Sequence, residues 1–259
     1  MKILFMGRKQ VSANLLRFLT KQDHIEIVGV LTDSHLQGSP TTAAAQELGL
    51  PLYTFDTALE AMREGRLKYD LGLSVLYWRK LRDEFLSIPT LGTINFHPAL
   101  LPEYKGTGGY NLAIMDELNE WGNTAHYVDA SIDTGEIIEV DRFPIDAETE
   151  TAQSLERKTM QALEPFAQRI IARAIESKTK LPTTPNIGGR YVSRDEMEAM
   201  KQILDGDNIE KKIRAFWFPP YDGAYVEING QKYTLINRQL LEEVAPKDST
   251  SLFAGKANA

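Results

Sequence analysis

The sequence predicts an α/β protein with a mostly parallel sheet, followed by a small C-terminal α+β extension. Two observations predict the sheet. Short apolar runs alternate with helical patterns over the first 180 residues, and several of these runs end in polar residues. A third observation predicts the extension: a Pro/Thr-rich connector near residues 180–186 precedes short helical patterns and a hairpin signal. We therefore expect one domain at 1–180 and a second at 181–259.

The first part of the chain alternates strand and helix patterns regularly. Lys2–Gly7 is a continuous apolar run typical of a buried parallel strand, and Val11–Leu19 repeats apolar residues at helical spacing. The alternation continues with strands expected at Ile25–Leu31, Leu52–Phe55, Leu71–Tyr77 and Thr93–Phe96, and helices at Pro40–Leu48 and Thr57–Glu64. Such alternation gives a Rossmann-like sheet with right-handed crossovers, whose ligands bind beyond the carboxyl ends of the strands.

The later part of the chain is predicted to contain two further strands, several helices and a hairpin. Two strands are expected around the turn Asp133-Thr134-Gly135, and a long helix after them. The expected ranges are Asn123–Ser131 and Glu136–Arg142 for the strands, Glu148–Ser177, Arg194–Leu204 and Ile209–Phe216 for the helices, and Ala224–Ile228 and Gln231–Ile236 for a hairpin. Asn229-Gly230 between the hairpin strands is a strong type I′ turn signal. We expect the polar residues from Pro246 onward to be disordered.

Composition excludes several classes of protein. With 42% hydrophobic and 25% charged residues, no apolar run long enough for a membrane span and no cysteine, the chain is predicted to be a cytoplasmic globular protein without disulfides or thiolate chemistry. The N-terminus enters a strand pattern directly, without a signal-peptide pattern. A net charge of −7 argues against a general binder of nucleic acid.

The strongest functional signal is the string Ile94–Pro102 together with the later Asp133-Thr134-Gly135. Asn95 and His97 are two residues apart at a strand end, so their side chains share one face. An amide that can donate to an oxyanion, an imidazole that can take a proton and a carboxylate that can orient the imidazole are what acyl transfer to an amine requires. These three residues are the predicted catalytic group.

These motifs are also compatible with other kinds of site. His97, His126 and Asp133 could hold a metal, but no close-spaced ligand pair supports this, and we predict no metal. The first loop has one glycine where a dinucleotide site needs three, and no phosphate-binding Gly-x-x-x-x-Gly-Lys motif occurs. Gly106-Thr107-Gly108-Gly109 fits either a phosphate seat at a helix start or a flexible turn.

Residues 1–180 resemble the catalytic domain of the 10-formyltetrahydrofolate-dependent formyltransferases. The matching stretches are Met1–Gly7, Val28–Thr32, Ile94–Gly106, Ala113-Ile114 and Ile132–Ile137. The resemblance implies the formyltransferase fold, with Asn95, His97 and Asp133 as the catalytic residues and reduced folate as formyl donor. By the same resemblance, the folate lies against Tyr77, Trp78, Arg79, Leu81, Ala130 and Ile132.

The substrate whose amine accepts the formyl group is harder to predict. The stretch Glu103–Asn111 is similar to enzymes that act on nucleotide-linked amino sugars such as GDP-perosamine, in which a small C-terminal extension with a hairpin is common. The expected substrate-binding residues are Arg8, Lys9, Tyr104, Lys105, Gly106, Gly109 and Tyr110. We therefore predict a sugar N-formyltransferase that serves surface polysaccharide (O-antigen) synthesis, with no nucleic-acid or membrane partner and with the hairpin as a homodimer element.

Two alternatives remain open at this point. The chain could be a methionyl-tRNA formyltransferase or another transformylase, although residues 181–259 hold ten Lys/Arg and eleven Asp/Glu, a poor balance for binding nucleic acid. It could also be a non-catalytic module that binds folate or a nucleotide sugar. The aromatic run Phe216-Trp217-Phe218 could stack on a base or form the small core of the extension.

Overall fold

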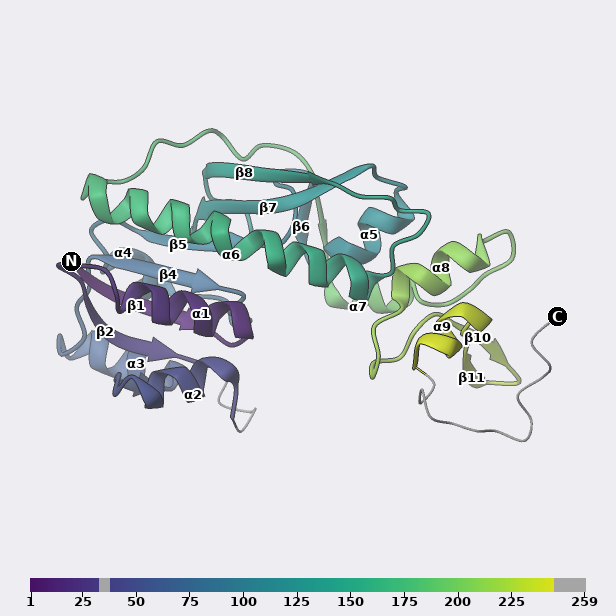
Figure 1. The fold of residues 1–259 in the computed structure, drawn as a ribbon, viewed down its shortest axis with the longest axis horizontal. Helices are drawn as coiled ribbons and strands as arrows, with labels where there is room; N and C mark the ends of the chain where they lie inside the picture. The colour runs from purple at the N-terminus through teal and green to yellow at the C-terminus, as the bar shows by residue number, and fades with distance from the viewer. Residues whose placement is uncertain (33–37, 245–259) are drawn as a thin grey trace.

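A seven-stranded sheet forms the centre of the protein in the computed structural model, which describes residues 1–32 and 38–244 (Figure 1). In sheet order the strands are β3 (Leu52–Tyr53), β2 (Glu26–Leu31), β1 (Lys2–Gly7), β4 (Leu71–Val75), β5 (Thr93–His97), β7 (Glu120–Tyr127) and β8 (Ile137–Pro144). The first five are parallel, whereas β7 runs antiparallel to β5 and β8 antiparallel to β7. The predicted α/β class with a mostly parallel sheet is confirmed.

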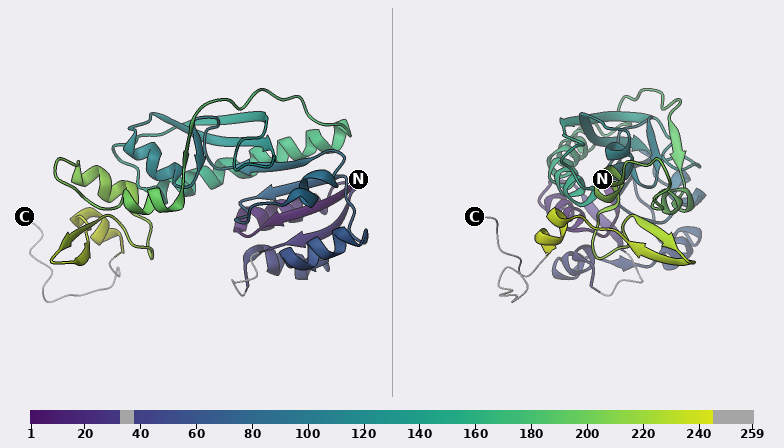
Figure 2. Two further views of the ribbon diagram at one scale, coloured as in Figure 1. Left: turned by 180° about the vertical axis from the view of Figure 1, so that it is seen from behind. Right: turned by 90° about the vertical axis from the view of Figure 1, so that its right-hand side faces the viewer.

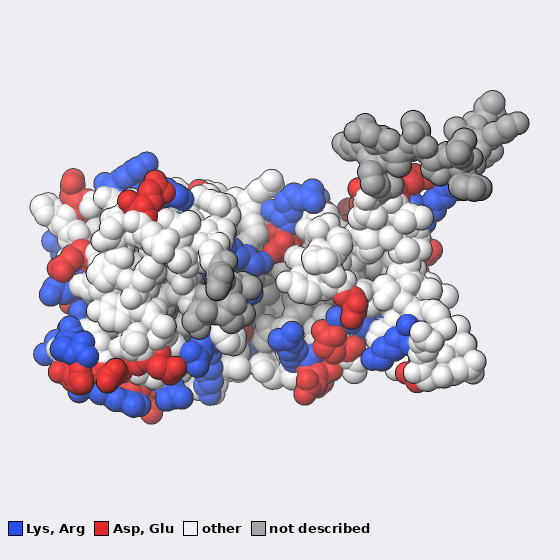
Figure 3. Space-filling model, turned by 90° about the horizontal axis from the view of Figure 1, so that it is seen from below, with Lys and Arg blue, Asp and Glu red and all other residues white. Residues whose placement is uncertain are grey.

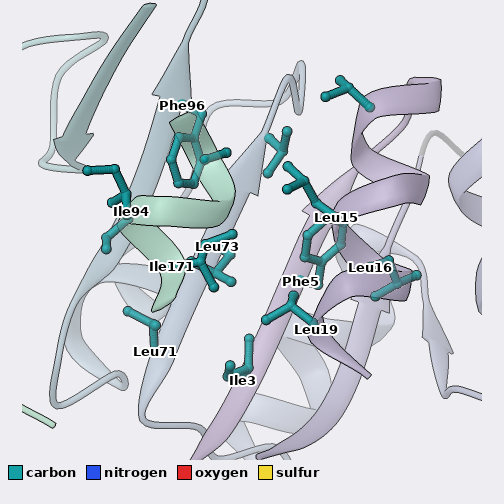
Figure 4. Close-up of a cluster of buried hydrophobic side chains, with 14 of the residues drawn as sticks. Ile3, Phe5, Leu15, Leu16, Leu19, Leu71, Leu73, Ile94, Phe96 and Ile171 are labelled. Atoms are coloured by element: carbon teal, nitrogen blue, oxygen red, sulfur yellow. The ribbon is translucent and has the colours of Figure 1, made fainter. Parts of the chain in front are cut away.

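Helices cover both faces of this sheet (Figures 1 and 2). One face packs against α1 (Gln10–Leu19), α2 (Pro40–Glu47) and α6 (Ala152–Ser177), and the other against α3 (Phe55–Arg63) and α4 (Asp83–Ser87). Strand β1 shows why both faces are apolar: Ile3 and Phe5 join the first cluster, and Leu4 and Met6 join the second. Figure 4 shows Phe5 and Phe96 within the first cluster, where helices α1 and α6 meet the sheet.

The remaining elements lie outside the seven-stranded sheet. They are β6 (Tyr104–Gly106), α5 (Gly109–Met115), β9 (Arg190–Val192), α7 (Arg194–Ala199), α8 (Ile209–Phe216), β10 (Tyr225–Ile228), β11 (Gln231–Thr234) and α9 (Arg238–Val244). Their strands form two separate pairs, β6 with β9 and β10 with β11. Phe216 is buried with Leu112 and Ile114 of α5, so this ring of the aromatic run belongs to a core. Strands β10 and β11 pair around Asn229 and Gly230, both at positive φ, which confirms the predicted hairpin.

The structure corrects several predicted boundaries. The long helix begins at Ala152 and not at Glu148, because Thr151 and Ser154 form a capping box that fixes its first turn. The predicted helix from Arg194 to Leu204 ends at Ala199. Helices α4 and α9 and strands β6 and β9 were not predicted, since each is too short to show a clear period. Two predicted features lie outside the described residues: the polar residues Asp33 and Ser34, which were expected to end the second strand, and the tail from Pro246.

Candidate active site

The candidate site lies at the carboxyl ends of β4 and β5 and in the loops beside them. Register places Ser74 of β4, Asn95 of β5 and His126 of β7 opposite one another in a single row across three strands. Side chains in such a row project from the same face of the sheet. His97 follows two positions after Asn95 and therefore shares that face.

Hydrogen bonds on both sides fix the amide of Asn95. The Ser74 hydroxyl donates to Asn95 Oδ1 at 2.8 Å, and Asn95 Nδ2 lies 3.1 Å from His126 Nε2. His126 Nδ1 lies 2.8 Å from the Tyr127 carbonyl, which can only accept, so Nδ1 donates there and Nε2 accepts from the Asn95 amide. One amide hydrogen of Asn95 is thus used on His126, and the second can point to a ligand.

His97 is held in one orientation with its other nitrogen beside a carboxylate. Its Nε2 donates to the Tyr104 carbonyl at 2.8 Å, so the lone pair of the neutral ring is on Nδ1. Nδ1 lies 3.6 Å from Asp133 Oδ2, too long for a hydrogen bond but close enough for a strong charge interaction. A proton that arrives on Nδ1 is therefore stabilised by Asp133.

Asp133 occupies a tight turn that other segments hold in place. Its φ is +55°, a left-handed conformation that Asp tolerates better than most residues. Its Oδ2 accepts from the Gly106 N–H at 2.9 Å, and the Asn186 amide donates to the carbonyls of Asp133 and Gly135 at 3.0 and 2.8 Å. A Cβ at Gly135 would lie 1.8 Å from the Tyr127 carbonyl oxygen, so the turn requires glycine there.

Burial and charge set the protonation states of this pair. Burial lowers the pKa of His97 below its usual 6.5, and the charge of Asp133 opposes this effect only in part. Burial alone would raise the pKa of Asp133, but His97 and the Gly106 N–H outweigh it and lower the pKa. Near neutral pH, His97 is neutral and Asp133 ionised, and the Gly106 N–H supports the carboxylate without a charged imidazole.

These groups line a cavity of about 290 Å³. Its lining includes the predicted catalytic residues Asn95, His97 and Asp133, together with the predicted donor-site residues Tyr77, Trp78, Arg79, Leu81 and Ile132. Ala130 lies between two lining residues, Asp129 and Ser131, but is not itself part of the lining. The structure thus brings the predicted catalytic and folate-binding residues together, and their roles stay predictions.

The predicted acceptor residues are more scattered, and among them Gly106 lines this cavity. Lys9 forms an ion pair with Glu156 of α6, and Lys105 is buried with its ammonium donating to the Gly188 carbonyl at 2.7 Å. Tyr104 and Tyr110 pack edge-on against Trp121. Arg8, which follows β1, and Gly109, which begins α5, lie outside the lining as well.

Four residues near the site were given no catalytic or binding role from sequence; His126 among them was expected only to line the cleft from a strand, and the structure places it there. Ser74 and His126 hold Asn95, and Thr124 accepts from Leu101 N–H and donates to the Ala99 carbonyl, which fixes the loop after His97. The signal for all three is a polar residue inside an otherwise buried strand. The fourth, Tyr191, lines the cavity from β9, and no local pattern marks it.

The structure also bears on the predicted absence of a metal site, on the Gly-rich stretch and on membrane-spanning helices. Among residues 1–32 and 38–244, no group of three His, Cys, Asp or Glu side chains is arranged to hold a metal ion. Gly108, with φ of +81°, caps the seven-residue helix α5, so the Gly-rich stretch forms a helix start. The same described part of the chain contains no helix with the length and apolar character needed to cross a membrane.

The chain belongs to the formyl transferase family, whose sequence model matches residues 1–171. Among curated proteins, it is 30% identical over 241 residues to methionyl-tRNA formyltransferase of Lysinibacillus sphaericus, covering 86% of this chain and 74% of that protein. A similar enzyme of Bacteroides thetaiotaomicron is 32% identical over 244 residues, covering 89% of this chain and 71% of that protein. The predicted family is therefore confirmed.

Solved structures of sugar N-formyltransferases share the fold. A 4-N formyltransferase from Francisella tularensis superposes with a TM-score of 0.75 at 20% identity, covering 90% of this chain and 96% of that one. The N-formyltransferase of Helicobacter canadensis, in complex with folinic acid and dTDP-3-aminofucose, gives 0.69 at 25% identity, covering 90% and 86%. The shared fold thus extends well beyond residue 180.

Proposed function

We propose that this protein transfers a formyl group from 10-formyltetrahydrofolate to the amine of a nucleotide-linked amino-deoxy sugar. The observation that carries the proposal is the similarity to the H. canadensis enzyme over 90% of this chain, a length that includes much of the C-terminal extension. That enzyme was crystallised with a reduced folate and an amino sugar nucleotide. The cavity beside Asn95 and His97 supplies the chemistry that such a transfer needs.

In the proposed reaction, the neutral amine attacks the formyl carbon of the donor. A bond forms between the amine nitrogen and that carbon, and the carbonyl electrons move onto oxygen. The free amide hydrogen of Asn95 is placed to donate to this oxyanion, a contribution of ~2.7–4 kcal/mol in sites of this kind. Because Asn95 is held by Ser74 and His126, little reorganisation is needed at that moment.

The amine must then lose a proton and the donor nitrogen must gain one. His97 Nδ1 has the free lone pair and faces Asp133, so it is placed to take the proton as an imidazolium paired with the carboxylate. The oxyanion then collapses, the carbon–N10 bond breaks, and the His97 imidazolium returns its proton to N10, which restores the neutral ring. The products are the N-formyl sugar and tetrahydrofolate.

A methionyl-tRNA formyltransferase is the second candidate, because the curated relatives at 27–32% identity carry that name. Charge argues against it. Residues 181–259 are close to neutral, and Figure 3 shows Lys/Arg and Asp/Glu side chains interspersed on the face seen from below. Binding driven by neutralising phosphates calls for a basic surface.

We also propose that the product serves surface polysaccharide synthesis.

The test is a formylation assay with the purified protein and 10-formyltetrahydrofolate. The acceptors are dTDP-3-aminofucose, GDP-perosamine, a UDP-linked amino sugar and charged initiator tRNA, and mass spectrometry detects the added formyl group. We expect formylation of an amino sugar and none of the tRNA. Turnover on the tRNA alone would reject the proposed acceptor. Folate binding without transfer to any amine would favour a non-catalytic module.

A further inference from the structure

Residues 186–192, which we call the strap, connect the candidate active site to the helices and hairpin of the C-terminal extension. Asn186 at its start donates to the Asp133 turn, and Gly188 accepts from the buried ammonium of Lys105. Its last three residues form β9, which pairs in parallel with β6. The strap is therefore fixed to the loop after His97 and to the turn that carries Asp133.

This attachment places one aromatic side chain in the cavity. Tyr191 lies opposite Lys105 in the β6–β9 ladder, and it lines the same cavity as Asn95 and His97. Its ring lies against Gly106, where an added Cβ would come within 2.7 Å of the ring. Yet 51% of Tyr191 remains exposed. A large ring held firmly at its base and left uncovered in a cavity is well suited to pack against a ligand.

The position of Tyr191 within the cavity indicates which ligand it meets. The lining residues Tyr77–Leu81 and Ile132 are the ones that the family resemblance gives to the folate. Tyr191 instead lies against Gly106, whose N–H donates to the Asp133 carboxylate. The acceptor amine must reach Asn95 and His97 inside this small space, so the part of the acceptor next to Tyr191 is the sugar ring and not the distant nucleotide.

We propose that Tyr191 is a specificity-determining residue that packs on the sugar ring carrying the acceptor amine. This inference rests on the proposed function and deepens it. The phenol presents an apolar face to the ring carbons and a hydroxyl that can bond to a sugar oxygen. The strap thereby lets the C-terminal extension select the acceptor while the chemistry stays with Asn95, His97 and Asp133.

The test compares Tyr191→Ala and Tyr191→Phe with wild type, using 10-formyltetrahydrofolate and the amino sugar nucleotide from the panel above that wild type formylates. We expect Tyr191→Ala to raise KM for the amino sugar by roughly tenfold, with kcat and the KM for folate within about twofold. Tyr191→Phe keeps the ring and should recover most of this loss. Tyr221→Ala is the matched control, because Tyr221 is 72% exposed and outside the cavity lining.

Four outcomes would overturn the inference. An unchanged KM for the sugar with a reduced kcat would show that Tyr191 only supports Gly106 and the Asp133 carboxylate. A raised KM for folate alone would place Tyr191 on the donor side. Wild-type kinetics in Tyr191→Ala, with the amino sugar formylated normally, would reject this inference and leave the proposed function intact. A wild-type protein inactive on every amino sugar would reject both.

Discussion

Substitution of Asp133 by Asn tests the proposed proton transfer most directly. The change keeps the size of the side chain, and Asn is also tolerated at the left-handed φ of +55°. The amide oxygen can still accept from the Gly106 N–H, which is bonded to Asp133 Oδ2 at 2.9 Å. What disappears is the negative charge 3.6 Å from His97 Nδ1.

The size of the effect follows from that distance. Two unit charges 3.6 Å apart attract by ~4–5 kcal/mol at an effective dielectric constant of about 20. The side chains of His97 and Asp133 are only 9% and 11% exposed, so solvent screens this attraction weakly. If the imidazolium forms in the transition state, Asp133→Asn should lower kcat/KM by roughly 10²–10³-fold.

The pH profile gives a second, independent readout. Neutral His97 is the base, and burial holds its pKa below 6.5, so the acid limb of kcat/KM in wild type should lie below pH 6.5. Asp133 is the neighbour whose charge raises the pKa of His97. Removing that charge lowers the pKa further, and the acid limb of Asp133→Asn should shift to lower pH.

The assay is steady-state formylation from pH 4.5 to 9, with thermal unfolding and folate binding measured on the same samples. Asp56→Asn is the control, because it removes one negative charge from the exposed first turn of α3. We expect the control to behave as wild type. An Asp133→Asn variant that folds, binds folate and keeps a third or more of wild-type kcat/KM would refute the proposed role of the carboxylate.

Three further substitutions test other parts of the site. Asn95→Ala should lower kcat by roughly 10²–10³-fold while the dissociation constant for folate, measured by calorimetry, stays within about twofold. Ser74→Ala removes one hydrogen bond that orients this amide, so kcat should fall about fivefold, and a rate equal to wild type would show that the bond is dispensable. Gly106→Ala should lower the unfolding midpoint and the activity together, because φ is +84° and the new Cβ would lie 2.5 Å from the Val192 carbonyl oxygen. An unchanged melting temperature would contradict that account of Gly106.

Much of the sheet could be predicted because its strands are short apolar runs between helical patterns. Strands β1, β2 and β5 were placed within one or two residues. The direction of β7 could not be predicted, since a buried strand has the same apolar pattern whether its neighbour is parallel or antiparallel. Strands β6 and β9, three residues each, pair across more than 80 residues of chain, and no local pattern encodes such a contact.

The candidate site shows the same division between local and distant information. Asn95 and His97 share a face because of strand periodicity, and that placement followed from sequence alone. The approach of Asp133 to His97 depends on the turn after β7, on the Gly106 N–H and on Asn186, and the last two lie 27 and 53 residues from Asp133 along the chain. The Asp133-Thr134-Gly135 motif and the resemblance could both suggest the carboxylate, but its position is set by tertiary contacts.

The segment after residue 180 is central to how the site is built. Leu181 is 6% exposed in the main core and its N–H donates to the Tyr127 hydroxyl at 2.8 Å. Thr184 pairs with Ile137 through two backbone hydrogen bonds, and Asn186 then reaches the Asp133 turn. These contacts lead from the end of β7 and the first residue of β8 to the Asp133 turn, so a change in residues 181–186 can move Asp133 and Tyr191 together. Residues on both sides of the predicted boundary at 180 therefore hold the Asp133 carboxylate in place.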